Sequence, residues 1–194
     1  MAQEAHLWLL RHAPVAGPHG IIHGPDAPAD TRDRVRLEAL RAELPQTAAV
    51  YCSPSRRTWE TALALGLSPI KEPAFREQNF GAWTGRRHDD LSVELGPAYE
   101  DFWNSPAINY PPGGESFVDQ IDRVAKGLAA LPEGDIILVV HSGTIRAALA
   151  IALSIPAENA LRFVIDPMSL TQIDRLAATW RVGKVNQDPR TKSP

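Results

Sequence analysis

The sequence lacks the features of a membrane protein, a nucleic-acid binder and a disulfide scaffold. It has one cysteine, Cys52, so no disulfide can form within the chain. Its longest apolar stretch, residues 136–155, is interrupted by His141, Ser142 and Arg146, whereas a membrane span needs about 18 or more apolar residues. The 20 Lys and Arg against 23 Asp and Glu give a net charge of −3, without the basic excess that nucleic-acid binding favours.

The remaining composition is that of a globular domain. The N-terminus shows no basic and apolar leader, so we expect a protein of the reducing cytoplasm, with no membrane or nucleic-acid partner. With 194 residues, 44% of them hydrophobic, the chain has the size of a single domain with its own core. Its 17 prolines are about 9% of the residues, against a usual value of about 5%, and indicate many fixed turns.

Short apolar runs alternate with helical spacings along the chain. Strands are predicted over residues 6–11, 48–52 and 135–140, more weakly over 70–75, and as a terminal pair over 169–176 and 179–185. Helices are predicted over residues 31–44, 55–65, 89–95, 97–103, 117–131 and 144–153. Strands that alternate with helices predict a three-layer α/β sandwich, in which helices cover both faces of a mostly parallel central sheet.

Capping residues set the expected ends of several helices. Asp30 or Thr31 is expected to cap the first helix, and Ser53, followed by Pro54, is expected to cap the second. Gly134 is expected to close the long amphipathic helix before the strand at 135–140.

Three of the predicted strands lead directly into basic or histidine residues. These residues are Arg11 and His12, then Arg56 and Arg57, and finally His141, Ser142 and Gly143. Ligands of open α/β sheets bind at the carboxyl ends of the strands, so these side chains are expected to converge. Guanidinium groups and the free N–H groups of a helix start both bind phosphate oxygens, and the sequence therefore predicts an anion site.

Each of these residues also has a more ordinary interpretation. A single histidine at a strand end is more often a hydrogen-bonded structural residue, and an arginine on a first helical turn is usually solvated. A metal site is the competing interpretation of the histidines, but His12, His19 and His23 lack the tight spacing of metal ligands. We therefore expect no metal and no cofactor.

Four segments, in order, resemble motifs of the histidine phosphatase superfamily, in its phosphoglycerate mutase-like branch. They are LRHAP at 10–14, similar to the Arg-His-Gly signature; SPSRRTWETA at 53–62, similar to the Ser-x-x-x-Arg element; EQNFGAWTG at 77–85, similar to the acid loop; and VHSGTIR at 140–146, similar to the second-histidine turn. GGES at 113–116 also fits. The likeness covers residues 6–155 and implies a phosphoglycerate mutase-like fold over 1–194, with a small lid or insert around 76–110.

The resemblance implies a metal-independent phosphomonoesterase that acts through a phosphohistidine on a small phosphorylated metabolite. His12 would be the nucleophile, kept neutral by the nearby positive charges of Arg11 and Arg57. Arg11, Arg57 and His141 would hold the phosphoryl oxygens, and Glu77 would protonate the leaving oxygen and later activate water.

Some roles have rivals within the same motifs. Ser142 and Gly143 would add backbone donors to the phosphate. Successive helical residues point about 100° apart, so one of Arg56 and Arg57 faces the phosphate, and the motif selects Arg57. Glu115 is the rival candidate for the acid. Its place at a helix start is equally consistent with a residue that caps the helix or interacts with the helix dipole.

The sequence leaves three questions open. Ala13 replaces the glycine of the signature, and IIHGP at 21–25 only loosely resembles a loop of α-ribazole phosphatases. The alternatives are therefore a phosphoglycerate mutase-type phosphoryl transfer and a non-catalytic protein that binds a phosphate ligand. A homodimer is also left open. Aromatic residues in the segment 80–103 either contact a ring-bearing substrate or only pack: Phe80, Trp83, Tyr99, Phe102 and Trp103.

Overall fold

The structure, a computed structural model, describes residues 4–190, within which six strands form one sheet in the order β3-β2-β4-β1-β5-β6. The strands are β1 (Ala5–Arg11), β2 (Ala49–Cys52), β3 (Ile70–Lys71), β4 (Gly134–Val140), β5 (Leu170–Arg175) and β6 (Trp180–Gln187). The first four run parallel to one another, and β5 and β6 add an antiparallel hairpin beside β1. The predicted α/β class with a mostly parallel sheet is confirmed.

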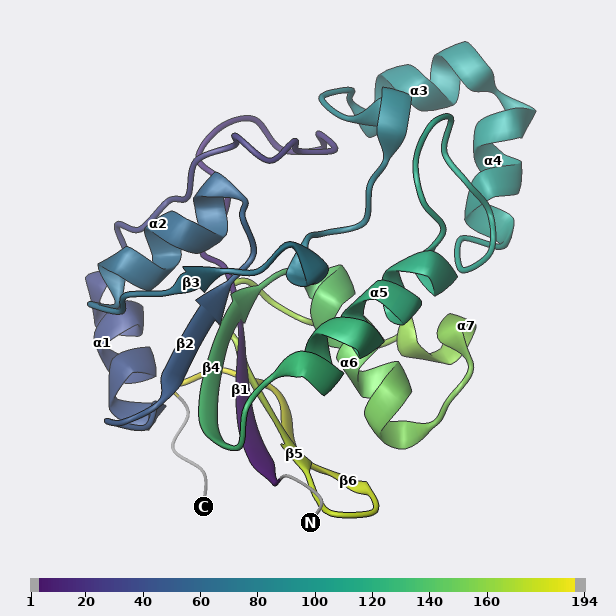
Figure 1. The fold of residues 1–194 in the computed structure, drawn as a ribbon. Coiled ribbons are helices and arrows are strands. Elements are labelled where there is room, and N and C mark those ends of the chain that lie inside the picture. The colour runs from purple at the N-terminus through teal and green to yellow at the C-terminus, as the bar shows by residue number, and fades with distance from the viewer. Residues whose placement is uncertain (1–3, 191–194) are drawn as a thin grey trace.

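Helices cover both faces of this sheet. They are α1 (Arg34–Glu43), α2 (Arg56–Ala64), α3 (His88–Leu95), α4 (Pro97–Asn104), α5 (Phe117–Ala130), α6 (Ser142–Leu153) and α7 (Ala157–Ala160), with 3₁₀ turns at Pro73–Phe75 and Gly81–Trp83. Figure 1 shows α1 and α2 on one side of the strands, α5 to α7 on the other, and α3 and α4 standing apart from both layers. Within residues 4–190 no helix combines the length and apolarity needed to cross a membrane.

The central strand β4 is buried on both faces, which explains its near-continuous apolar run. Ile136 and Leu138 pack into the core beneath α5 and α6, whereas Ile137 and Val139 point the other way, toward α1 and α2. All four side chains are buried. Alternate side chains of a strand face opposite sides, so a strand covered on both faces must be apolar at every position.

The segment 76–110 contains α3 and α4 and has a small core of its own. Trp83, Leu91, Tyr99 and Phe102 are buried together with Ile22, which comes from the loop after β1. The Trp83 ring meets those of Phe102 and Tyr99 edge-on, at centroid distances of 4.8 and 5.2 Å. Aromatic packing of this kind holds the two short helices over the loop from β1.

The cap of α1 lies beyond both predicted positions, Asp30 and Thr31. Asp33 caps the helix, and its carboxylate accepts a hydrogen bond from the backbone N of Arg36 at 3.0 Å. Asp30, the predicted cap, instead accepts hydrogen bonds from the backbone and side chain of Arg32. Several acidic residues compete for the cap in this stretch, and composition alone does not select among them.

Two further helix ends and one strand also differ from the prediction. Ser55, not Ser53, precedes α2, and Ser53 Oγ accepts a hydrogen bond from the Ser55 backbone N at 3.3 Å. The helix α5 ends at Ala130, because the proline after Leu131 favours extended backbone at that residue. Gly134 does not close the helix but begins β4, with a φ of +90°. The strand expected over 70–75 stops at Lys71 because Pro73 opens a 3₁₀ turn.

Candidate active site

The carboxyl ends of β1 and β4 bring the two predicted histidines together. The backbone N of His12 donates to the Val140 carbonyl at 3.0 Å, and the rings of His12 and His141 lie 5.1 Å apart, edge to face. Arg57, on the first turn of α2, places its Nε 3.2 Å from His12 Nε2. Exposure of these three side chains is 5% or less, so the predicted cluster is a buried one.

Two contacts determine which nitrogen of His12 carries the proton. Nδ1 lies 2.6 Å from the Ala13 carbonyl oxygen, which can only accept, so Nδ1 is the protonated nitrogen. Arg57 Nε donates to Nε2, which is therefore the unprotonated nitrogen. Burial lowers the pKa of His12 well below its usual range, and the positive charge of Arg57 lowers it further. The neutral imidazole with a basic Nε2 is the form favoured here.

His141 has a buried ring nitrogen, Nδ1, that lacks a hydrogen-bond partner within residues 4–190. Its Nε2 lies 2.8 Å from Ser53 Oγ, which is closer than the 3.3 Å from Ser53 Oγ to Ser55 Oγ. In the tautomer in which Nε2 accepts from the Ser53 hydroxyl, the proton of the neutral ring sits on Nδ1, which is buried and unpaired. Burial lowers the pKa of His141 well below its usual range, and Arg57 and Arg11 add to this effect.

The arginines at the site differ in their partners. Arg11 donates from Nη1 to the Ile165 carbonyl, and its buried Nε has no hydrogen-bond partner within the described chain. Arg57 is 4% exposed, whereas its neighbour Arg56 is exposed to solvent and pairs with Glu60 at 2.6 Å. The structure thus turns Arg57 toward the histidines and Arg56 away from them.

These residues surround a pocket of about 310 Å³. Its inner wall holds five of the predicted residues: Arg11, His12, Arg57, Glu77 and Ser142. The outer wall includes His88 of α3 and Trp103 of α4, so the insert lies over the histidine and arginines. Of the other predicted residues, His141 is fully buried behind this wall and Gly143 lines a neighbouring pocket.

Glu77 is held by the start of α6. Its Oε2 accepts hydrogen bonds from Ser142 Oγ and Gly143 N at 3.5 and 3.4 Å. Its Oε1 accepts from the Gln120 side chain at 3.2 Å and from the Gln78 backbone at 3.1 Å. A Cβ on Gly143 would lie 2.2 Å from Glu77 Oε1, so any other residue at this position would displace the Glu77 carboxylate. The Gly143 N–H, expected to serve the phosphate, contacts the acid instead.

Among residues 4–190, no group of three or more His, Cys, Asp or Glu side chains is placed to hold a metal ion. The pocket offers guanidinium and imidazole groups, which suit an anion. Fold and pocket chemistry together agree with the phosphate chemistry that the motifs imply.

Comparison with known proteins decides the family. The histidine phosphatase superfamily (branch 1) matches the chain over residues 7–188. The chain belongs to this superfamily. It is 31% identical over 191 residues to the adenosylcobalamin/alpha-ribazole phosphatase of Escherichia coli (strain K12), covering 91% of this chain and 94% of that protein.

Other relatives of this histidine phosphatase chain match in part. It is 32% identical over 130 residues to the glucosyl-3-phosphoglycerate phosphatase of Mycobacterium tuberculosis (strain H37Rv), covering 59% of this chain and 58% of that protein. The chain is also 34% identical over 132 residues to the bifunctional protein Rv2228c of the same organism. This match covers 64% of this chain but only 36% of the longer mycobacterial protein.

Solved structures show the same fold as this histidine phosphatase chain. The alpha-ribazole phosphatase from Shigella flexneri has a TM-score of 0.82 at 26% identity, covering 94% of this chain and 96% of that one. The mycobacterial glucosyl-3-phosphoglycerate phosphatase Rv2419c, in complex with VO3, has a TM-score of 0.78 at 29% identity, covering 93% and 98%. The predicted family and the phosphoglycerate mutase-like fold are confirmed.

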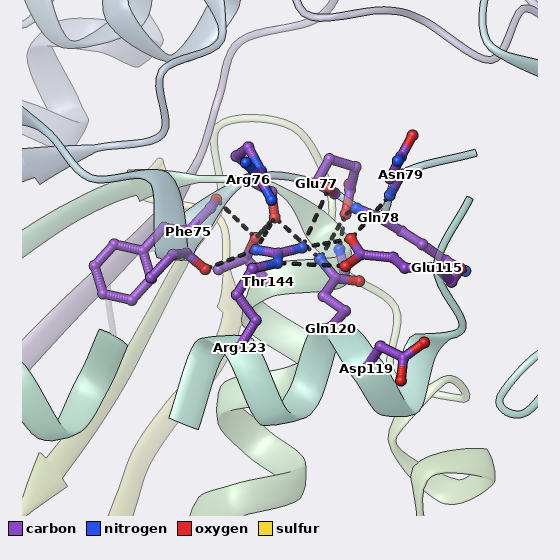
Figure 2. A network of polar contacts seen from close by, with 12 residues as sticks. Phe75, Arg76, Glu77, Gln78, Asn79, Glu115, Asp119, Gln120, Arg123 and Thr144 are labelled. Atoms are coloured by element: carbon purple, nitrogen blue, oxygen red, sulfur yellow. Dashed lines mark hydrogen bonds and ion pairs between the residues drawn. The ribbon is translucent and has the colours of Figure 1, made fainter. Parts of the chain in front are cut away.

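Arg123 of α5 anchors the backbone that carries Glu77 (Figure 2). Its Nη1 donates to the carbonyls of Ala74 and Arg76 at 2.7 and 3.2 Å, and its Nη2 donates to that of Glu77 at 3.5 Å. Nη2 also pairs with the Glu115 carboxylate at 2.5 Å. One guanidinium therefore joins α5, the acid-bearing segment and the loop before α5.

Glu115, the rival acid of the sequence analysis, is not the cap of α5. Its carboxylate accepts from the Asn79 backbone at 2.9 Å and pairs with Arg123, and it lines none of the three pockets around Glu77. The cap of α5 is Ser116, which forms a reciprocal capping box with Asp119. Glu115 thus stabilises the segment that carries Glu77, the predicted acid.

Sequence reasoning missed Gln120 and Arg123 as residues of the site. Gln120 is fully buried and donates from Nε2 to Glu77 Oε1 and to the Arg76 carbonyl, each at 3.2 Å (Figure 2). A signal was present, because Gln120 lies three residues after Phe117 on the apolar face of its helix. A polar residue on a buried face needs a partner, and that partner is Glu77, the predicted acid.

Proposed function

We propose that the chain is a metal-independent phosphomonoesterase that hydrolyses a small phosphorylated metabolite through a phosphohistidine at His12. The observation that carries this proposal is the neutral His12, whose unprotonated Nε2 faces Arg57 in a pocket that also holds Glu77. A basic nitrogen beside positive charge and a carboxyl group is what phosphoryl transfer to an imidazole requires.

The proposed reaction has two steps. His12 Nε2 attacks phosphorus, so an N–P bond forms while the bond from phosphorus to the leaving oxygen breaks. The protonated carboxyl of Glu77 gives its proton to that oxygen, and the alcohol departs. Water then attacks the phosphohistidine, its proton passes to the Glu77 carboxylate, and His12 Nε2 leaves with the electron pair as inorganic phosphate is released.

Positive charge and unpaired polar groups at the pocket would supply the electrostatic stabilisation of the transition state. Arg11 and Arg57 carry charges at the pocket, and two buried donors, Arg11 Nε and His141 Nδ1, lack partners within residues 4–190. Unpaired buried donors are costly unless a ligand accepts their hydrogen bonds. A phosphoryl group with its oxygens on Arg11, Arg57 and His141 would satisfy them and stabilise the charge of the transition state.

A screen of small phosphate esters, with and without EDTA, tests the chemistry. We expect hydrolysis that survives chelation, and a loss of at least about a thousandfold in kcat/KM for His12→Ala. Rapid acid-free quenching with a labelled substrate should trap label on wild-type protein and none on His12→Ala. Loss of activity with EDTA, or activity retained in His12→Ala, would contradict the mechanism, and sustained interconversion of 2- and 3-phosphoglycerate would favour a mutase.

The adjacent arginines give a matched pair of variants. Arg57→Ala removes a charge from the pocket and should lower kcat/KM by about a hundredfold or more. Arg56→Ala removes an exposed pair with Glu60 and should change kcat/KM by less than about threefold. The reverse pattern would show that the wrong arginine has been assigned to the phosphate.

A further inference from the structure

A second pocket, of about 320 Å³, adjoins the pocket of His12. Glu77, Gln78, Phe80, Trp103 and Ser142 line both pockets and form their shared wall. His12, Arg11 and Arg57 do not line the second pocket, which therefore begins on the far side of the predicted acid. An in-line reaction sends the leaving group away from the nucleophile, so this is where it would go.

Most of the second pocket is apolar, and three of the five aromatic residues of the segment 80–103 line it. Phe80, Phe102 and Trp103 line it, whereas Trp83 and Tyr99 only pack in the core of the insert. Trp103 is 43% exposed and stands perpendicular to Phe102, at a centroid distance of 5.0 Å. Rings that are held by their neighbours, with a face left free, suit a flat or apolar ligand group.

One cation, Arg146, lines this pocket, and within residues 4–190 it forms no salt bridge with a carboxylate, although the charge of Glu77 acts on it at longer range. It follows Ser142 by one helical turn, so both side chains face the same way from α6. Its Nε donates to the Phe163 carbonyl at 2.9 Å, which orients the guanidinium and leaves its two Nη groups for another ligand. Two parallel N–H groups match the two oxygens of a carboxylate.

We propose that this second pocket, the leaving-group pocket, binds the alcohol part of the substrate and that Arg146 recognises a carboxylate on it. The substrate class is then a phosphate monoester of an alcohol that carries an apolar or ring-bearing portion and a carboxylate. This inference rests on the proposed function, because the leaving oxygen must lie at Glu77, which lines both pockets.

A third pocket, of about 310 Å³, also touches Glu77 and supplies the internal comparison. It is lined by Arg76, Arg57, Asn79 and His23, with no aromatic ring of the insert among its lining residues. Arg57 there is needed for the phosphoryl group, and Arg76 has an exposed side chain. Arg76→Gln is therefore the matched control for Arg146→Gln, since each removes one arginine from a pocket beside the acid.

Two substrates that differ in one charge test the proposal: 4-carboxyphenyl phosphate and its neutral amide, 4-carbamoylphenyl phosphate. We expect the wild-type protein to prefer the carboxylate ester by about tenfold or more in kcat/KM, mainly through KM. Arg146→Gln should bring this ratio close to one, Arg146→Lys should restore part of it, and Arg76→Gln should keep the wild-type ratio. Trp103→Ala should raise KM for both esters alike.

The outcomes separate this proposal from the proposed function. If neither ester is hydrolysed in a reaction that depends on His12, the phosphatase proposal itself fails. If both are hydrolysed through His12 but without a carboxylate preference, or with a preference that survives Arg146→Gln, the leaving-group pocket is wrong and the phosphatase stands. A preference lost in Arg76→Gln instead would place the leaving group in the third pocket.

Discussion

Gly143 shows how closely the acid side chain is enclosed at the scale of one residue. A Cβ at this position would lie 2.2 Å from Glu77 Oε1 and 2.8 Å from Gln120 Oε1. Gly143→Ala must therefore displace Glu77, and a shift of about 1 Å in a reacting group costs up to about a hundredfold in rate. We expect kcat to fall by about ten- to a hundredfold, measured under saturating phosphate ester.

Gly183 provides the control for this substitution. A Cβ there would meet nothing closer than 3.7 Å, and the residue lies in β6, on the edge of the sheet. Gly183→Ala should keep wild-type kcat, while thermal unfolding of both variants reports any loss of stability. Wild-type kcat in Gly143→Ala would show that the position of Glu77 does not limit the reaction.

Residue types were predictable from the motifs, but their contacts were not. Helical geometry allowed only one of Arg56 and Arg57 to face the phosphate, and the motif selected Arg57. The structure places Arg57 beside His12 and leaves Arg56 exposed. The proton position on His12 depends on the Ala13 carbonyl, and that contact is a matter of backbone direction after β1. No spacing in the sequence reports such a direction.

At the scale of elements, Arg123 fastens α5 to the segment that carries Glu77 (Figure 2). Arg123→Met keeps the length of the side chain but removes its bonds to the carbonyls of Ala74 and Arg76, and leaves the largely buried Glu115 carboxylate unpaired. We expect the free energy of unfolding in urea to fall by about 1–3 kcal/mol. We also expect kcat to fall by about tenfold, because the acid is held less firmly.

A second variant separates positioning from stability. Glu115→Gln removes the ion pair but keeps an oxygen for the Asn79 backbone N–H, and Arg123 keeps its carbonyl bonds. It should lose stability with a smaller change in kcat, and Arg123→Lys should recover part of the kcat lost in Arg123→Met. Equal kcat in wild type and Arg123→Met would mean that the bonds stabilise the fold without positioning the acid.

The existence of most elements was predictable, whereas their ends were decided by local competition. Apolar periodicity located α5 and β4 within a few residues. Asp33 and not Asp30 caps α1, because the carboxylate of Asp30 accepts its hydrogen bonds from Arg32. The short helix α7 was missed, since four residues carry no measurable periodicity.

At the scale of the whole molecule, the strand order creates the site. Because β4 lies between β2 and β1, the residue after β4, His141, falls between Ser53 after β2 and His12 after β1. The sequence predicts parallel strands but carries no signal for this order, which depends on long-range pairing. The same convergence concentrates positive charge locally in a chain whose net charge is −3.

Burying neutral imidazoles at this convergence makes stability depend on pH. Burial lowers the pKa of His12 and His141 well below the usual value, and that of the partly buried His23 to a lesser degree, with neighbouring positive charges adding to each shift. Between pH 6.5 and 5, the unfolded chain binds protons that the folded chain does not, so the free energy of unfolding falls as pH falls. Each fully shifted histidine contributes a slope of up to about 1.4 kcal/mol per pH unit.

Urea unfolding at several pH values between 7.5 and 5, in buffers without phosphate, measures this slope. His141→Asn removes one buried imidazole and should lower the slope below pH 6.5 by up to about 1.4 kcal/mol per pH unit, whatever its effect on stability at pH 7.5. If His141→Asn and the wild-type protein lose stability at the same rate down to pH 5, His141 is protonated in the fold, and its role as a neutral donor to phosphate is wrong.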